Sequence, residues 1–196
     1  MIKNEHFLEI RIPLKRDAQW AEWASKMRST VKAAGIPVQW QFRFHYHMTI
    51  LFLDDDHCVN ELTQGFERLV KPLSVFPITI DKLDAFTTGN GADHIIYMTA
   101  TQVPSQITTL AQDARTLADK LNANYDKRPF KPHITLGRVS ADKASLDQLQ
   151  AVLHAIQVPT FNCMLTDAEH RYRDYANVIK QKIIKSWDLN TRKIQP

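Results

Sequence analysis

The segment Phe130-Lys131-Pro132-His133-Ile134-Thr135-Leu136-Gly137-Arg138 carries the most information in this chain of 196 residues. Within it, apolar Ile134 and Leu136 alternate with His133 and Thr135, which is the pattern of a short strand with one buried face. Side chains two positions apart on a strand point to the same side, so the imidazole and the hydroxyl should project together. Such a pair suits an anionic substrate and acid–base chemistry.

The same pattern occurs 86 residues upstream (133 − 47), at His47-Met48-Thr49-Ile50, in a run that stays apolar to Leu53. A single His-x-Thr would mean little, because its residues are common and recur by chance. Two copies on predicted strands, the second flanked by Phe-x-Pro and by an arginine, are a much more specific signal.

Two His-x-Thr motifs at this separation resemble the 2H phosphoesterase superfamily. Within it the chain is similar to the LigT-like branch, the 2'-5' RNA ligases or RNA 2',3'-cyclic phosphodiesterases. The resemblance implies an α+β fold with two lobes related by a pseudo-twofold duplication. Antiparallel sheets flanked by helices would enclose a central cleft, and each lobe would contribute one motif to it. We therefore expect residues 1–196 to form a single two-lobed domain.

The resemblance also implies an activity, the hydrolysis of 2',3'-cyclic phosphate ends of RNA or nucleotides to 2'-phosphates, with 2'-5' RNA ligation as the reverse reaction. His47 would be the general acid and His133 the general base, while Thr49 and Thr135 would donate hydrogen bonds to the phosphate oxygens. Nothing else in the sequence indicates which of the two histidines is the acid and which is the base. Because these groups supply the acid, the base and the donors, we expect neither a metal ion nor another cofactor.

Four further residues are predicted to bind the substrate. Arg138 matches a family position that contacts phosphate, but strict alternation puts it on the strand face opposite the motif side chains. It reaches the phosphate only if the strand bends or ends there. Lys131, Phe130 and Tyr46 are predicted to line the cleft and hold a base, and a surface lysine and core aromatic rings are the competing interpretation.

Three alternative functions use other features of the sequence. The same histidines would serve a phosphodiesterase acting on 2'-5' oligonucleotides or another cyclic phosphate. A metal-dependent hydrolase would use His45 and His47, a His-x-His pair, with Asp54–Asp56 and His57 close by,. A non-catalytic RNA-binding module would retain the cleft for binding RNA but would not catalyse a reaction. The metal alternative leaves the second His-x-Thr unused, and the intact motifs argue against a module that has lost its chemistry.

Composition narrows the class of protein. The 25 lysines and arginines exceed the 21 acidic residues, giving a net charge of +4, which agrees with an anionic partner such as RNA without selecting one,. The two cysteines are isolated, and the longest apolar run near the motifs is too short to span a bilayer,. We expect a monomeric cytoplasmic protein that does not bind membranes.

Periodicity predicts the remaining elements. Strands are expected near residues 7–12, 38–44, 47–53, 76–80, 95–97, 133–138 and 161–165, and helices near 20–31, 59–70, 107–121 and 146–156,. Residues 178–184 suit either a strand or a short amphipathic helix, and the family resemblance favours a strand, in a pair joined around Asp174. The strand at 76–80 should pair with the one at 95–97 across the Thr88–Gly91 turn. Asp54–Asp56 should cap the second helix, and Ser145 with Gln148 should form a capping box at the fourth. Arg171 and Arg173, among interspersed charges, are expected on a solvated face.

Overall fold

A computed structural model describes residues 4–41, 46–54, 58–174 and 181–191 of the chain. The strands are β1 (Asn4–Ile12), β2 (Gln39–Trp40), β3 (Tyr46–Leu53), β4 (Phe76–Ile80), β5 (Lys82–Thr87), β6 (Asp93–Thr99), β7 (Ile134–Ser140), β8 (Phe161–Leu165), β9 (Asp167–Asp174) and β10 (Gln181–Asp188). The α-helices are α1 (Trp20–Ala33), α2 (Val59–Val70), α3 (Ser105–Lys120) and α4 (Leu146–His154), and the 3₁₀ turns are Leu14–Arg16 and Leu189–Thr191.

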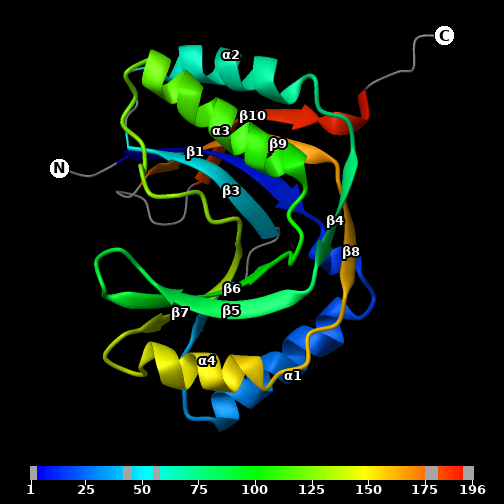
Figure 1. The fold of residues 1–196 in the computed structure, drawn as a ribbon, viewed down its shortest axis with the longest axis vertical. Coiled ribbons are helices and arrows are strands. Elements are labelled where there is room, and N and C mark those ends of the chain that lie inside the picture. Colours follow the sequence, from blue (N-terminus) through cyan, green and yellow to red (C-terminus); the bar gives the residue numbers. More distant parts are fainter. Residues whose placement is uncertain (1–3, 42–45, 55–57, 175–180, 192–196) are drawn as a thin grey trace.

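Two four-stranded antiparallel sheets organise the molecule. One has the strand order β10-β9-β1-β3 and the other β2-β7-β6-β5, while β4 and β8 form a two-stranded ribbon at one side. The sheets face each other, with α2 and α3 on the outer side of the first and α1 and α4 on the outer side of the second (Figure 1). The first motif strand, β3, belongs to one sheet and the second, β7, to the other. This is the α+β two-lobed arrangement that the sequence predicted.

The helices pack where their apolar faces predict. Trp20, Trp23, Ala24, Met27 and Val31 of α1 are all buried. Ser145 accepts a hydrogen bond from the backbone of Gln148, whose side chain accepts one from the Ser145 backbone, so the predicted capping box starts α4,. The helix faces close the outer sides of both sheets and leave the inner sides to form the site.

Both motif strands contain a β-bulge immediately after the threonine. In β3, Leu51 pairs with Leu8 and Thr49 with Glu9, so Ile50 is the extra residue. In β7, Gly137 pairs with Ile96 and Thr135 with Tyr97, so Leu136 is the extra residue. A bulge shifts the alternation of the side chains that follow it by one position. The duplication therefore extends to backbone detail that the sequence does not display.

Several expected elements differ from the structure. The strand at 76–80 pairs with β8, and the partner of β6 across the Thr88–Gly91 turn is β5, which periodicity missed. Periodicity also missed the charged strand β9, which ends at Asp174 and pairs with β10, as in the strand pair expected from the resemblance. Cys58, not an aspartate, is the N-cap of α2, so Asp54 precedes the helix, and Asp55 and Asp56 lie outside the described residues. Of the strand expected at 38–44, the structure has only Gln39–Trp40 as strand; Val38 and Gln41 lie outside it, and residues 42–45 lie outside the described part.

In the described part of the chain, no helix combines the length and the apolar character that crossing a membrane requires.

Candidate active site

One cavity of about 810 Å³ lies between the sheets and collects the four motif side chains. His47 and Thr49 reach it from β3, and Thr135 reaches it from β7, with His133 on the residue just before that strand. In β3 the residue between them, Met48, is fully buried and does not line the cavity. Alternation on each strand thus delivers an imidazole and a hydroxyl to the same cavity from opposite sheets.

The imidazole of His133 is held in one orientation. Its Nδ1 lies 2.7 Å from the Lys131 carbonyl oxygen, which only accepts, so Nδ1 carries the hydrogen and donates,. In the neutral ring Nε2 is then an acceptor. The rings of Phe86 and Tyr97 meet His133 edge to face, at centroid distances of 5.2 and 5.9 Å. Burial lowers the pKa of His133, and the hydrogen bond to Lys131 opposes this shift only in part,.

The imidazole of His47 has a different environment. Its Nε2 lies 3.5 Å from Oε2 of Glu9, a β1 carboxylate whose side chain is only 2% exposed. The other oxygen of Glu9 lies 2.9 Å from Nε of Arg171 on β9. An adjacent carboxylate favours the protonated form of an imidazole, whereas burial among aromatic rings favours the neutral form. The two histidines therefore sit in surroundings that favour opposite charge states.

Cationic side chains dominate the cavity wall. Among the described residues that line it, five are lysine or arginine and one is acidic: Arg115, Arg128, Lys131, Arg138 and Arg173, with Asp126. This excess suits an anionic ligand.

The structure brings three of the four predicted binding residues to the cavity. Arg138 lines it because the bulge at Leu136 returns its side chain to the cavity side, and its Nη1 lies 2.9 Å from Asp93. Lys131 lies over the rings of Phe86 and Tyr97, 4.6 and 4.8 Å from their centroids. Phe130 lines the cavity as well.

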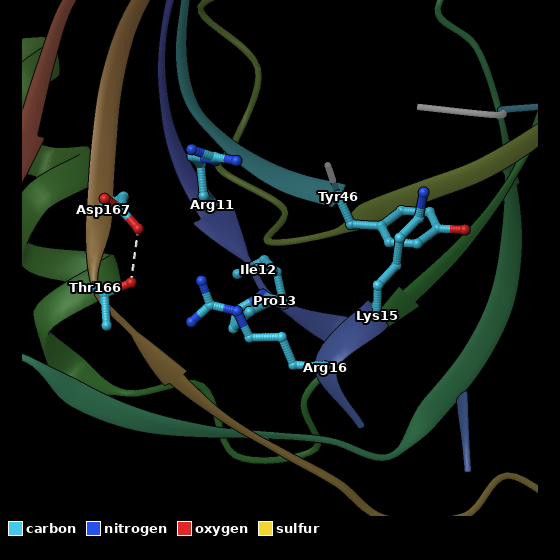
Figure 2. A pocket seen from close by; sticks show the side chains of 8 residues that line it. All are labelled: Arg11, Ile12, Pro13, Lys15, Arg16, Tyr46, Thr166 and Asp167. Atoms are coloured by element: carbon cyan, nitrogen blue, oxygen red, sulfur yellow. Dashed lines mark hydrogen bonds between the residues drawn. The ribbon is translucent and has the colours of Figure 1, made fainter. Parts of the chain in front are cut away.

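Tyr46 is not brought to this cavity. It is buried, packs edge to face on Trp20, and lines a separate cavity of about 130 Å³ with Arg11, Lys15 and Arg16 (Figure 2). Alternation along β3 explains the difference, because Tyr46 and His47 are neighbours and point to opposite faces of the sheet. The predicted base-holding role of Tyr46 at the His-x-Thr cleft is therefore wrong.

Sequence analysis missed the charged cluster behind His47. Arg171, expected on a solvated face, is buried and lies 2.7 Å from Glu169, whose other oxygen lies 3.3 Å from Arg11. Glu9 and Glu169 are cross-strand partners on β1 and β9. Alternation within β1 predicts that Glu9 and Arg11 share one face of the strand. That this face lies next to His47 follows only from the pairing of β1 with β3 and β9.

The metal alternative falls largely outside the described residues, since His45, Asp55, Asp56 and His57 are not among them. Two opposed imidazoles of different charge preference, with hydroxyls and cations around them, form a constellation suited to acid–base chemistry on a phosphate ester.

Comparisons with known proteins agree with this geometry. The model of the 2'-5' RNA ligase superfamily matches residues 47–174, which include both motifs and more than half of the chain. No curated protein sequence matches the chain.

Solved structures share the fold at low sequence identity. Escherichia coli LigT complexed with 3'-AMP is 19% identical, with a TM-score of 0.66, over 95% of this chain and 98% of that one. Kluyveromyces marxianus Usb1 is 7% identical, with a TM-score of 0.60, over 92% and 97%. TT0787 of Thermus thermophilus is 16% identical, with a TM-score of 0.57, over 95% and 98%. With the family match over both motifs, these likenesses lead to one conclusion: the chain belongs to the 2'-5' RNA ligase superfamily of 2H phosphoesterases.

Proposed function

We propose that this protein is a phosphodiesterase that hydrolyses the 2',3'-cyclic phosphate ends of RNA or nucleotides without a metal ion. One observation carries the proposal: two His-x-Thr pairs enter a single cationic cavity from opposite sheets. The similar E. coli LigT has been solved with 3'-AMP and with phosphate, so a nucleoside phosphate is a reasonable ligand class for this cavity too.

The proposed reaction uses each histidine once. Nε2 of neutral His133 takes a proton from a water molecule, whose oxygen forms a new bond to phosphorus. The bond between phosphorus and the ribose 3'-oxygen breaks, and protonated His47 gives its proton to that oxygen, leaving a 2'-phosphate and a 3'-hydroxyl. Thr49 and Thr135 donate hydrogen bonds to the non-bridging oxygens, where charge develops. In a 2'-5' ligation a 5'-hydroxyl takes the place of the water molecule, the same bond to the 3'-oxygen breaks, and the proton transfers run in the same direction.

The test is an activity screen with the four nucleoside 2',3'-cyclic monophosphates and a 2'-5' dinucleotide, in the presence of excess chelator. We expect hydrolysis of the cyclic phosphates to 2'-phosphates, identified by phosphorus NMR, with full activity in chelator. The double variant His47→Ala/His133→Ala is the inactive control.

Other outcomes decide between the alternatives. Turnover of the 2'-5' dinucleotide alone would identify an oligonucleotide phosphodiesterase. Activity lost in chelator and restored by zinc or manganese would favour the metal-dependent alternative. RNA binding without turnover of any substrate would overturn the proposal in favour of a binding module.

A further inference from the structure

We propose that Glu9 is a positioning residue that keeps the imidazole of His47 protonated and fixes its orientation at the edge of the cavity. This deepens the function proposed above, and its catalytic consequence rests on that function. The charge coupling between the two side chains stands on geometry alone and is tested without any substrate.

Glu9 lies behind His47 rather than in the cavity. It is 1% exposed and does not line the cavity, whereas His47 does. Its Oε2 lies 3.5 Å from Nε2 of His47, and the two residues come from the neighbouring strands β1 and β3. A carboxylate at this distance favours the positively charged ring over the neutral one, whichever nitrogen carries the hydrogen of the neutral form,. The contact therefore bears on the charge of the ring as well as on its orientation.

Arg171 keeps Glu9 ionised. An isolated carboxylate this deeply buried would take up a proton, but the Arg171 guanidinium lies 2.9 Å from Oε1 and remains charged at any ordinary pH,. Arg171 is shared with Glu169, 2.7 Å away, and Glu169 in turn lies 3.3 Å from Arg11. Negative and positive groups thus alternate from His47 to Arg11, and the two oxygens of Glu9 serve different partners.

Most of the other charges around His47 are positive and oppose its protonation. On its own sheet these are Arg11, its cross-strand partner on β1, together with Arg171 and Arg173 on β9. Across the cavity, the charged or titratable groups among the described lining residues are Lys131, His133, Arg138, Arg128 and Arg115, together with the acidic Asp126. Glu169 is held by two arginines. Glu9 is a carboxylate in direct contact with the His47 ring, so its charge stabilises the imidazolium,.

The first test is an NMR titration of the histidine ring resonances in the unmodified protein, with His47 assigned through a His47→Gln variant. We expect His47 to titrate above about 6.5, the ordinary midpoint of a histidine, and above His133. A His47 midpoint at or below that of His133 would overturn the proposal without any Glu9 variant having to fold.

The second test is the same titration in Glu9→Gln, which keeps the size of the side chain and removes its charge. We expect the His47 midpoint to fall by about 1 pH unit or more, the usual effect of losing an adjacent opposite charge. Glu9→Asp keeps the charge and should restore most of the shift. The matched control is Glu22→Gln, which removes an exposed carboxylate from α1 and should leave the midpoint unchanged. An unchanged midpoint in folded Glu9→Gln would contradict the proposal.

A kinetic arm separates this proposal from the proposed function. In Glu9→Gln the alkaline limb of kcat/KM against pH should move down with the His47 midpoint. A shift of one unit leaves about tenfold less imidazolium above both midpoints. A nitrophenyl phosphodiester, whose leaving oxygen needs no proton, should be turned over almost normally. If the unmodified protein hydrolyses no cyclic phosphate, the proposed function fails while the titration still decides the role of Glu9.

Discussion

At the scale of single residues, the candidate site consists of two chemically identical groups made unequal by their neighbours. His133 faces aromatic rings and a backbone carbonyl, and His47 faces a buried carboxylate. Desolvation favours the neutral ring and an adjacent negative charge favours the protonated one. The environments thus support the proposed roles of base and acid, which the two near-identical motifs could not distinguish.

The first prediction concerns the shape of the pH–rate profile. We expect a bell, because one ring must be neutral while the other is protonated. His47→Ala and His133→Ala should each lower kcat/KM for a cyclic phosphate by about 10²–10⁴-fold. His47→Ala should lose the alkaline limb and recover preferentially on a nitrophenyl phosphodiester. Recovery of His133→Ala instead would show that the roles are reversed.

The second prediction concerns the ring that covers His133. Phe86→Ala admits water beside the imidazole and removes one of the two rings under the Lys131 ammonium. Both changes should raise the pKa of His133, since burial and the ammonium charge lower it in the intact protein. The base must be neutral to act, so the acid limb of kcat/KM should move to higher pH. An acid limb that stays in place or moves to lower pH would show that Phe86 does not hold down the pKa of His133.

At the scale of elements, the bulges in β3 and β7 determine which side chains enter the cavity. Without the extra residue Leu136, alternation would turn Arg138 away from His133 and Thr135,. Gly137 follows the bulge and lies tightly against β2. A Cβ on Gly137 would approach Cγ1 of Val38 to 2.7 Å and the ring of Trp40 to 2.9 Å.

The third prediction follows from this close approach. Gly137→Ala should force β2 away from β7 and destabilise the fold by about 1–3 kcal/mol, the usual range for overpacking. Urea unfolding measures this change, and the exposed neighbour Gln39→Ala is a control expected to stay within about 0.5 kcal/mol. Since Arg138 is the next residue, KM should also rise. Unaltered stability and KM would mean that β2 moves freely.

Most elements were predictable where one periodicity dominates. α1, α3 and α4 follow from apolar residues at helical spacing, and β1 from the alternation of Leu8, Ile10 and Ile12. Two strands were not predictable for opposite reasons. β5 has only two buried positions, Leu83 and Ala85, so its apolar pattern is too short to stand out. In contrast, β9 buries charged side chains that resemble solvated ones in the sequence.

The motif residues were accessible from the sequence because both copies are local patterns on single strands. Glu9 and Arg171 were not, because their burial depends on three strands that are distant in sequence and adjacent in space. The role of Arg138 could be predicted only on the condition that the strand bends, because a β-bulge cannot be recognised from the hydrophobic pattern of the sequence.

At the scale of the whole molecule, the first sheet carries buried titratable side chains on both faces. Opposite the site, His170 is fully buried against α2, where its ring meets Phe66 edge to face and its Nδ1 lies 2.9 Å from the Thr63 hydroxyl. That hydroxyl donates to the Val59 carbonyl, so His170 donates to it. Burial first, and then the nearby His6, lower the pKa of His170 to about 3.

The fourth prediction is that stability falls with acidification from near neutrality. The unfolded chain takes up a proton on this histidine near pH 6.5 and the folded chain only near 3, so stability is lost as the pH drops through that window,. Thermal or urea unfolding at a series of pH values measures the slope. His170→Gln should flatten it, whereas His154→Gln, at an exposed histidine of α4, should not. Equal slopes in all three proteins would contradict this account.

The two matched bulges have one more consequence. A pocket with equivalent halves would accept a phosphodiester in two opposite directions, and each histidine would meet the leaving oxygen half of the time. Counting three residues past each threonine leads to Phe52 in one half and Arg138 in the other, and both line the cavity. One half thus presents an aromatic face where the other presents a cation. A ligand with a flat, uncharged end and an anionic end therefore binds in one orientation, with the flat end toward Phe52 and the anionic end toward Arg138. These two side chains then decide which histidine meets the leaving oxygen.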